Sequence, residues 1–257
     1  MEQDLQEAIL SQIFDKLFVL TDEHTHTLCY PIVSDFECLK NAHTITIGAG
    51  DIHKNLETLA YVWKELGDQG ATRHSLIINL GGGMVTDLGG FAASTFKRGI
   101  RYINIPTTLL AMVDASVGGK TGINFNGLKN EIGVFSPAEY VLIDTQFLQT
   151  LDSPNLLSGY AEMLKHGIIS TTEHWAELLN FDLNQVDYPK LQELVAQSVQ
   201  IKEDIVEQDP FEKGIRKALN LGHTVGHAFE SLALEEGRPV LHGYAVAWGI
   251  VCELYFS

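Results

Sequence analysis

Short runs of β-branched and other apolar residues alternate with amphipathic segments through the first part of the chain. Apolar residues recur at helical spacing over residues 55–66 and 85–96, and residues 108–113 form a shorter helical candidate after Pro106. This alternation is typical of βαβ units, in which helices cover a parallel sheet. The strands that the pattern predicts are residues 17–20, 44–47, 76–80, 102–105 and 140–143.

The hydrophobic pattern changes near residue 150. From Leu156 onward only helical periodicity remains, as across residues 191–207, where apolar side chains fall on one helical face. We therefore expect two domains, an α/β domain at residues 1–150 and an all-α domain at residues 151–257. The last seven residues, VCELYFS, still carry a helical pattern without a helix-stop signal, so we expect the helical domain to be incomplete.

The charge balance narrows the range of partners. The chain carries 17 Lys and Arg against 33 Asp and Glu, a formal net charge of −16, and such an excess of acid opposes contact with nucleic acid or an anionic membrane surface. Any anionic partner is therefore expected to be small. No apolar run reaches the roughly 18 to 20 residues that a membrane span requires, and the acidic start differs from a secretion signal. The sequence thus predicts a cytoplasmic protein, with Cys29, Cys38 and Cys252 as reduced thiols.

A glycine-rich turn follows the third predicted strand. Gly81, Gly82 and Gly83 separate residues 76–80 from the helix predicted at residues 85–96. Backbone N–H groups in such a turn, together with a helix N-terminus, can bind a phosphate such as the pyrophosphate of a nucleotide. The spacing is not that of the G-x-G-x-x-G motif, so a turn that binds no ligand is an alternative.

A second glycine cluster at residues 118–122 is followed by Lys129 and Asn130. Its Gly-Gly-Lys-Thr sequence resembles the tail of a P-loop, but the earlier glycine that this motif needs is absent, so we reject a Walker A interpretation. We retain an anion site, in which two lysines, an asparagine and a flexible backbone hold a phosphate. A solvated basic loop is the alternative.

Several candidate metal ligands fall in the helical part of the chain. His223 and His227 lie four residues apart, on one face of a predicted helix, where two imidazoles can share a divalent metal. His242 lies in a later loop, and Glu162 and His166 share a helical face upstream. Two histidines and one glutamate with an open fourth position would form a catalytic zinc site, but spacing alone does not select three ligands from these five candidates.

Polar residues lead into the histidine cluster. Glu212, Arg216 and Asn220 follow one another at steps of four residues, and Lys202 precedes them. The steps of four predict one polar helical face directed at the metal. A solvated charged face with an ordinary ion pair is the alternative.

Taken together, these motifs resemble those of the 3-dehydroquinate synthase family of sugar phosphate cyclases. They follow in the order of the family and run from the first glycine turn nearly to the end of the chain, so the resemblance is highly specific. The matching stretches are GGGMVTDLGGF at 81–91, FKRG at 96–99, IPTTLLAMVDASVGGKTGIN at 105–124, GLKN at 127–130, SGYAEMLK at 158–165 and LNLGHTVGH at 219–227.

The resemblance implies a fold that agrees with the hydrophobic pattern. It implies an N-terminal Rossmann-like domain that binds NAD, a C-terminal helical domain that binds a metal and the substrate, and an active site in the cleft between them. It further implies that Glu162, His223 and His242 bind Zn²⁺ or Co²⁺, which makes His227 a substrate contact. The positions that match NAD contacts are Asp22, Asp51, Lys54, Gly82, Gly83, Met84, Asp87, Thr107, Thr108 and Lys129.

The resemblance also implies which residues act on the substrate. Lys202 and Arg216 are expected to bind its carboxylate, to which a guanidinium can donate two parallel hydrogen bonds. Arg98 is expected to reach the site of a partner subunit, which implies a homodimer. The catalytic positions are Asp114, Lys120, Lys165, Lys202, Glu212 and His227, and the substrate-binding positions are Arg98, Asn130, Arg216 and Asn220.

The implied reaction converts 3-deoxy-D-arabino-heptulosonate 7-phosphate, a small sugar phosphate, to 3-dehydroquinate and phosphate in the shikimate pathway of aromatic amino acid biosynthesis. A substrate hydroxyl at the metal would lose its proton while the carbon that bears it passes hydride to NAD⁺, and the resulting ketone permits β-elimination of phosphate. NADH then returns the hydride, the sugar ring opens, and an intramolecular aldol step closes the new ring. The substrate phosphate is expected to contact Lys120, Asn130 and His227.

Three alternatives and two departures from the family pattern accompany this interpretation. The alternatives are a cyclase that acts on sedoheptulose 7-phosphate or a hexose 6-phosphate, a metal-dependent polyol dehydrogenase of the same superfamily, and an inactive NAD- and zinc-binding relative. Asn155 replaces a glutamate that is usual in the family, and the family's chains continue well beyond residue 257. These departures bear on cofactor affinity, domain closure and activity.

Overall fold

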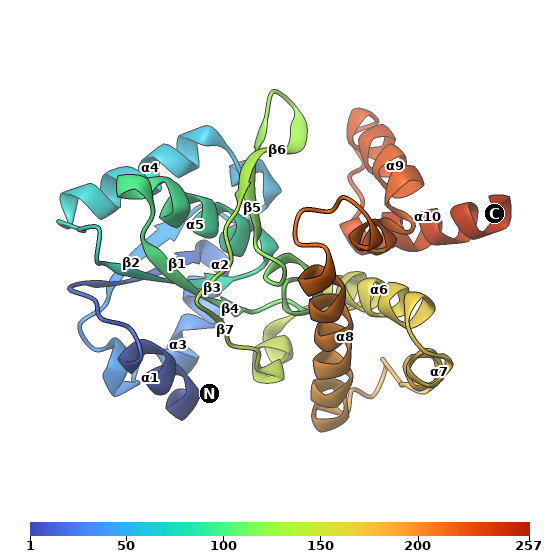
Figure 1. The fold of residues 1–257 in the computed structure, drawn as a ribbon, viewed down its shortest axis with the longest axis horizontal. Coiled ribbons are helices and arrows are strands. Elements are labelled where there is room, and N and C mark those ends of the chain that lie inside the picture. The colour runs from blue at the N-terminus through green and yellow to red at the C-terminus, as the bar shows by residue number, and fades with distance from the viewer. The chain divides into compact units, whose positions relative to one another are not determined.

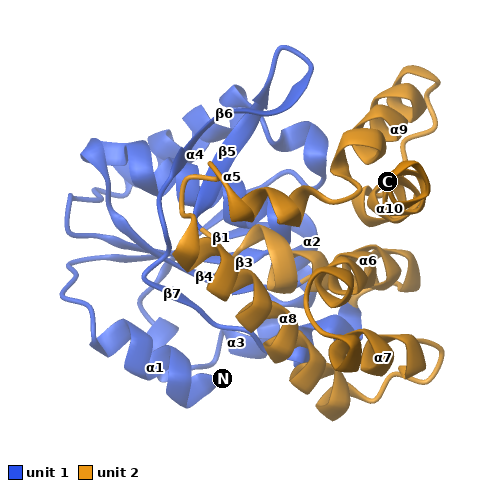
Figure 2. Cartoon of the chain, turned by 45° about the vertical axis from the view of Figure 1, so that its right-hand side comes forward, with its two compact units in different colours: residues 1–107, 119–150 blue, residues 108–118, 151–257 orange.

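The computed structural model describes all 257 residues, which divide into two compact units (Figures 1 and 2). Unit 1 comprises residues 1–107 and 119–150, and unit 2 comprises residues 108–118 and 151–257. The segment 108–118 thus belongs to unit 2, although the chain then returns to unit 1 before it enters unit 2 again.

Unit 1 is built on a parallel sheet with the strand order β2-β1-β3-β4-β7. Every residue of β1 and β3 is buried, because helices cover both faces of the sheet, with α4 and α5 on one side and α1 and α3 on the other (Figure 1). All five predicted strands are confirmed. They are β1 (Leu17–Asp22), β2 (His43–Ile47), β3 (Leu76–Gly81), β4 (Arg101–Pro106) and β7 (Tyr140–Val141).

Capping side chains and one close contact fix the helices of unit 1. Asn55 precedes α4, and its side-chain oxygen accepts a hydrogen bond from the Thr58 amide at 2.9 Å. Helix α5 packs closely on the sheet at Gly89. A Cβ at this position would overlap the Asn79 side chain. The two helices expected from apolar spacing are confirmed as α4 and α5. The helices are α1 (Glu2–Leu10), α2 (Glu23–Leu28), α3 (Tyr30–Val33), α4 (Leu56–Asp68) and α5 (Gly83–Thr95), and short helical turns are η1 (Glu37–Leu39), η2 (Asp51–His53), η3 (Phe96–Arg98) and η5 (Thr145–Thr150).

One element of unit 1 is not predicted by the sequence pattern. The segment that follows the second glycine pair forms an antiparallel hairpin of β5 (Lys120–Phe125) and β6 (Leu128–Phe135), where a flexible backbone is expected. Asn126 and Gly127 connect the strands with φ angles of 49° and 78°, and an Asn-Gly pair is a strong hairpin signal because type I′ turns need positive φ at both residues. The hairpin therefore fixes the two lysines and the asparagine of the second glycine cluster on paired strands.

Residues 151–257 of unit 2 contain helices joined by loops and no strand, as the periodicity predicts. Asp152, Thr171 and Asp187 cap α6, α7 and α8, each by accepting a hydrogen bond from a backbone amide. No helix of the structure has both the length and the apolar character that crossing a bilayer demands. The elements of unit 2 are η4 (Ala111–Ala115), α6 (Ser153–Ile169), α7 (Thr172–Asn180), α8 (Tyr188–Gln208), η6 (Ile215–Asn220), α9 (His223–Glu235) and α10 (His242–Phe256).

Glycines allow the helices of unit 2 to cross at short range. A Cβ at Gly243 of α10 would overlap the Ser158 carbonyl oxygen of α6, and a Cβ at Gly249 would overlap the Gly222 carbonyl oxygen before α9. The Gly243 amide donates a hydrogen bond to Ser158 Oγ at 3.0 Å. The N-terminus of α10, which begins at His242, is therefore held against α6.

Candidate active site

Glu162, His223 and His242 come together in unit 2 from three different helices. Glu162 lies one helical turn after Ser158 on α6, and His223 and His242 are the first residues of α9 and α10. The Nε2 atoms of both imidazoles lie 3.7 Å from Glu162 Oε1. This oxygen is buried and has no hydrogen-bond partner.

The geometry of these three residues fits a divalent metal. Zinc bonds of about 2.0 to 2.1 Å in a tetrahedral arrangement separate ligand atoms by about 3.4 Å, close to the 3.7 Å observed. A buried carboxylate oxygen without a donor is unfavourable, and a cation in front of Glu162 Oε1 would satisfy it. His227, which helical spacing pairs with His223, has a side chain that is 60% exposed. The structure therefore brings His242, rather than His227, beside Glu162.

A buried ammonium group balances Glu162. Lys165 Nζ contacts Glu162 Oε2, and both side chains are at most 1% exposed. Burial by itself lowers the pKa of Lys165, but the carboxylates of Glu162 and Asp114 outweigh burial and raise that pKa. Lys165 therefore stays charged, and Glu162 presents its other oxygen to the histidines.

A second ion pair joins Asp114 to Lys202. Asp114 lies in η4, a π-helical segment where an ordinary helix is predicted, and π-helical turns are frequent at functional sites. Lys202 Nζ donates to Asp114 Oδ1 at 2.5 Å and to the Asp114 carbonyl oxygen at 2.6 Å. Burial opposes ionisation of Asp114, but Lys202 and Lys165 outweigh it and hold the pKa of the carboxyl well below its usual range. Burial lowers the pKa of Lys202 despite its partner, so Lys202 releases its proton more readily than a solvated lysine does.

His166 is a fully buried imidazole next to these charges. Neither of its ring nitrogens has a hydrogen-bond partner, and one of them lies within 4.8 Å of carboxylate oxygens of Asp114 and Glu162. Burial and the ammonium groups of Lys165 and Lys202 hold the pKa of His166 well below its usual range. His166 is therefore neutral at physiological pH.

The predicted helical face of Glu212, Arg216 and Asn220 is wrong. Glu212 has a φ of 57°, a left-handed conformation that ends α-helical continuity, and the following residues form the 3-10 helix η6. The loop still brings its ends together, because Asn220 Nδ2 donates to Glu212 Oε1. Arg216 is 2% exposed and donates to the carbonyl oxygens of Pro210 at 2.7 Å and Gly118 at 3.0 Å. Backbone carbonyls thus hold its guanidinium in place.

In unit 1, several predicted cofactor residues gather near the carboxyl ends of the parallel strands, where open α/β sheets bind ligands. Lys54 Nζ lies 2.5 Å from both Asp87 Oδ2 and Asn130 Oδ1. Asp51 Oδ2 lies 3.8 Å from Lys129 Nζ. Asn130, expected to contact the substrate, thus lies among residues expected to bind the cofactor.

The first glycine turn connects β3 to α5. Gly82 is the N-cap of α5, Gly83 is its first residue, and Met84 packs partly buried against the core. The Thr107 amide donates to the Gly81 carbonyl oxygen at 3.0 Å, and the buried Thr107 hydroxyl has no hydrogen-bond partner. A helix N-terminus beside an unpaired hydroxyl fits a phosphate-bearing ligand.

Two other predicted site residues have local structural roles, and a third lies at the start of a strand. Asp22, at the end of β1, accepts a hydrogen bond from the Thr25 amide at 2.7 Å and caps α2. Thr108 Oγ1 accepts a hydrogen bond from the Ala111 amide at 3.2 Å and so supports the start of η4. Lys120 begins β5 with an exposed side chain.

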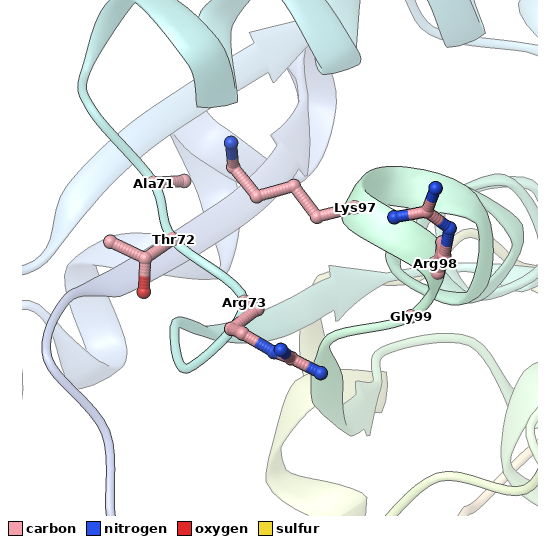
Figure 3. Close-up of a pocket in the computed structure, with 6 residues that line it drawn as sticks. All are labelled: Ala71, Thr72, Arg73, Lys97, Arg98 and Gly99. Atoms are coloured by element: carbon pink, nitrogen blue, oxygen red, sulfur yellow. The ribbon is translucent and has the colours of Figure 1, made fainter.

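Arg98 lies in a pocket of about 490 Å³ in unit 1, which none of the other predicted site residues lines (Figure 3). Lys97 and Arg98 have φ angles of 49° and 71°, so this turn is in a backbone conformation that non-glycine residues rarely adopt. Figure 3 shows three cationic side chains, Arg73, Lys97 and Arg98, at the border of the pocket. The pocket is therefore a basic patch on an acidic chain.

Glu230 is a residue that the sequence prediction missed. It is 7% exposed on α9, and its Oε2 lies 3.2 Å from His242 Nδ1 and 4.0 Å from His227 Nε2. A signal was present in the sequence, because Glu230 follows His223 by two helical turns and so falls on the same face of α9.

Comparisons with known proteins identify the family of the chain. The family model for the 3-dehydroquinate synthase N-terminal region matches residues 44–158, and the model for its C-terminal region matches residues 159–257. A curated 3-dehydroquinate synthase from Parabacteroides distasonis is 58% identical over 257 residues, which cover 100% of this chain and 73% of the relative. One from Streptococcus pyogenes is 41% identical over 93% of this chain and 66% of its own length.

Solved structures of sugar phosphate cyclases share the fold. A 2-deoxy-scyllo-inosose synthase complexed with carbaglucose-6-phosphate, NAD⁺ and Co²⁺ aligns with a TM-score of 0.87 at 26% identity, covering 97% of this chain and 68% of the other. A 2-epi-5-epi-valiolone synthase from Streptomyces hygroscopicus with NAD⁺ and Zn²⁺ bound aligns with a TM-score of 0.84 at 30% identity. The alignment covers 91% of this chain and 66% of the other. The predicted fold class, a Rossmann-like domain followed by a helical region, is confirmed. The chain belongs to the 3-dehydroquinate synthase family.

Proposed function

We propose that this protein is a 3-dehydroquinate synthase, which converts 3-deoxy-D-arabino-heptulosonate 7-phosphate to 3-dehydroquinate and phosphate. The observation that carries the proposal is the buried Glu162 Oε1, which has no hydrogen-bond partner and faces two imidazole nitrogens at 3.7 Å. This arrangement occurs in a chain that is 58% identical over its whole length to a curated enzyme of that name.

Each unit has a proposed ligand. Glu162, His223 and His242 of unit 2 would hold Zn²⁺ or Co²⁺, and the predicted cofactor residues of unit 1, including the turn at Gly82 and Gly83, would hold NAD. When bound, the metal lowers the pKa of a substrate hydroxyl, and the nicotinamide accepts and returns a hydride, so the reaction has no net redox change. The related cyclases with NAD⁺ and Co²⁺ or Zn²⁺ in their structures support this assignment.

The buried charges of unit 2 supply the other requirements of the reaction. Lys202 and Arg216 are fixed by Asp114 and by backbone carbonyl oxygens, so little entropy is lost when they bind a substrate carboxylate. Lys165 stays charged beside Glu162 and can stabilise an oxyanion. The lowered pKa of Lys202 suits a group that exchanges a proton with the substrate.

Sequence identity separates this function from its alternatives. The structures of cyclases that make other products are 26% and 30% identical to the chain, well below the 58% of the Parabacteroides relative. A glycerol dehydrogenase from Schizosaccharomyces pombe shares the fold at 15% identity with a TM-score of 0.64, which bears on the fold alone.

The test of the proposed function is phosphate release from 3-deoxy-D-arabino-heptulosonate 7-phosphate with zinc and a catalytic amount of NAD⁺. We expect one phosphate per substrate, no accumulated NADH, and loss of activity in Glu162→Gln but not in Glu235→Gln, an exposed position on α9. Stoichiometric NADH would indicate a dehydrogenase instead. Release from sedoheptulose 7-phosphate alone would indicate a different cyclase.

We also propose that the enzyme is a homodimer in which Arg98 completes the site of the neighbouring subunit. The basic pocket around Arg98 in an acidic chain supports this proposal. Mixing the inactive variants Arg98→Ala and Glu162→Gln would then restore activity, because a mixed dimer contains one site with both residues intact. No recovery, under conditions in which subunits exchange, would contradict the shared site.

A further inference from the structure

We infer that Glu230 is a positioning residue that holds the imidazole of His242 with its Nε2 directed at the metal site. The inference rests on the metal ligands proposed above. Glu230 lies on α9 and His242 begins α10, so the contact fixes a ligand from one helix by a carboxylate from another.

The two nitrogens of His242 face two different carboxylates. Nδ1 lies 3.2 Å from Glu230 Oε2, and Nε2 lies 3.7 Å from Glu162 Oε1. A carboxylate accepts hydrogen bonds, so Glu230 favours the tautomer in which Nδ1 carries the proton. That tautomer leaves the lone pair of Nε2 free to bind a metal.

The other histidine of the site is held in the same manner. His223 Nδ1 lies 3.3 Å from the Leu221 carbonyl oxygen, and His223 Nε2 lies 3.7 Å from Glu162 Oε1. Both imidazoles therefore have an acceptor behind Nδ1 and Glu162 in front of Nε2. Such outer partners orient metal-binding histidines and increase the basicity of the ligand nitrogen.

A direct metal-ligand role for Glu230 fits the structure less well. Glu230, His227 and His242 have potential metal-ligand atoms within 4.8 Å of one another. However, the His227 side chain is 60% exposed, and its Nε2 lies 4.0 Å from Glu230 Oε2. Glu230 Oε2 already lies at hydrogen-bond distance from His242 Nδ1. A metal there would replace this hydrogen bond and leave the buried Glu162 Oε1 without a partner.

The experiment is a competitive zinc titration of the metal-free protein and its variants. We expect Glu230→Ala to weaken zinc binding about 10- to 100-fold and Glu230→Gln to weaken it less, because the amide oxygen still accepts a hydrogen bond. Glu235→Gln, which changes an exposed glutamate on the same helix, and His227→Gln should bind zinc as the unaltered protein does. The Co²⁺ absorption spectrum, which reports ligand geometry, should change in both Glu230 variants and in neither control.

Two outcomes would overturn the inference. Unchanged zinc affinity in Glu230→Ala would show that Glu230 does not orient His242, and a loss in His227→Gln as large as that in Glu230→Ala would show that Glu230 is itself a ligand. Glu162→Gln distinguishes failure of this inference from failure of the proposed metal ligands. Equal zinc binding by this variant and the unaltered protein would refute the proposed ligand set. If Glu230→Ala does not fold, the near-isosteric Glu230→Gln still decides the matter by its affinity and its Co²⁺ spectrum.

Discussion

An exposed ion pair in unit 1 contrasts with the buried ion pairs among the predicted functional residues of unit 2. In unit 1 the side chains of the Lys129–Asp51 pair are 49% and 54% exposed. In unit 2 the Glu162–Lys165 pair is at most 1% exposed, and the side chains of Lys202 and Asp114 are 8% and 26% exposed. Water can therefore solvate the pair in unit 1 without a ligand, whereas the charges in unit 2 must satisfy one another.

Burial in unit 2 also affects protonation. The pKa values of Asp114 and His166 in unit 2 are both held well below their usual ranges. Burial removes water from around these groups, and the nearby ammonium groups then act at short range in a medium of low polarity. Strongly shifted pKa values are typical of catalytic sites, so we expect unit 2 to supply most of the proton chemistry.

Removal of one buried charge should have the largest effect on stability. Lys202→Met leaves Asp114 without its partner, and the loss of one member of a buried ion pair costs about 3–5 kcal/mol. Denaturant unfolding measures the change in free energy. The matched control is Lys129→Ala in unit 1, where an exposed pair contributes at most about 1 kcal/mol; equal losses in the two variants would remove the contrast between the units.

A methyl group at a helix crossing should have the next largest effect. Gly243→Ala places a Cβ against the Ser158 carbonyl oxygen, so α10 must move. We expect this to lower the free energy of unfolding by about 1–3 kcal/mol. Zinc affinity should also fall, because His242 begins that helix. Gly67→Ala in α4 meets nothing within 4 Å and should stabilise unit 1 by about 0.4–1 kcal/mol. Unchanged zinc binding in Gly243→Ala would contradict the role given to this crossing.

The smallest effect concerns pH. The folded-state pKa of His166 lies below the 6.5 of the unfolded chain, so the unfolded state binds the extra proton between these two values. Stability is therefore complete above about pH 6.5 and falls by up to about 1.4 kcal/mol per pH unit on acidification. His166→Asn should reduce this slope in the metal-free protein, whereas His74→Asn, at an exposed position of unit 1, should not. Identical pH profiles for all three proteins would exclude His166 as a source of acid sensitivity.

Much of the fold can be predicted from the sequence because burial leaves a regular pattern. Parallel strands such as β1 and β3 are buried on both faces and read as continuous apolar runs. The β5–β6 hairpin leaves no such pattern, because every residue of β6 is exposed. Only the Asn126–Gly127 turn indicates the hairpin in the sequence. The left-handed Glu212 likewise breaks a helix that a spacing of four residues predicts.

The candidate site is less predictable, because its members come from separate helices. Spacing within one helix favours His223 with His227, and the resemblance to a known family was needed to replace His227 by His242. The physical cause lies at Gly243 and Gly249, which let α10 approach α6 and the start of α9. A pattern read along the chain does not contain such a crossing, whereas Glu230 shares a face of α9 with His223 and so left a signal in the sequence.

The most direct test of a metal centre in unit 2 is an anomalous difference map, collected at the zinc absorption edge from crystals of the zinc-loaded protein. A single peak about 2.0 to 2.2 Å from Glu162 Oε1, His223 Nε2 and His242 Nε2 is the result we expect. A peak bound by His227 and Glu230 instead, with Glu162 still paired only with Lys165, would contradict it.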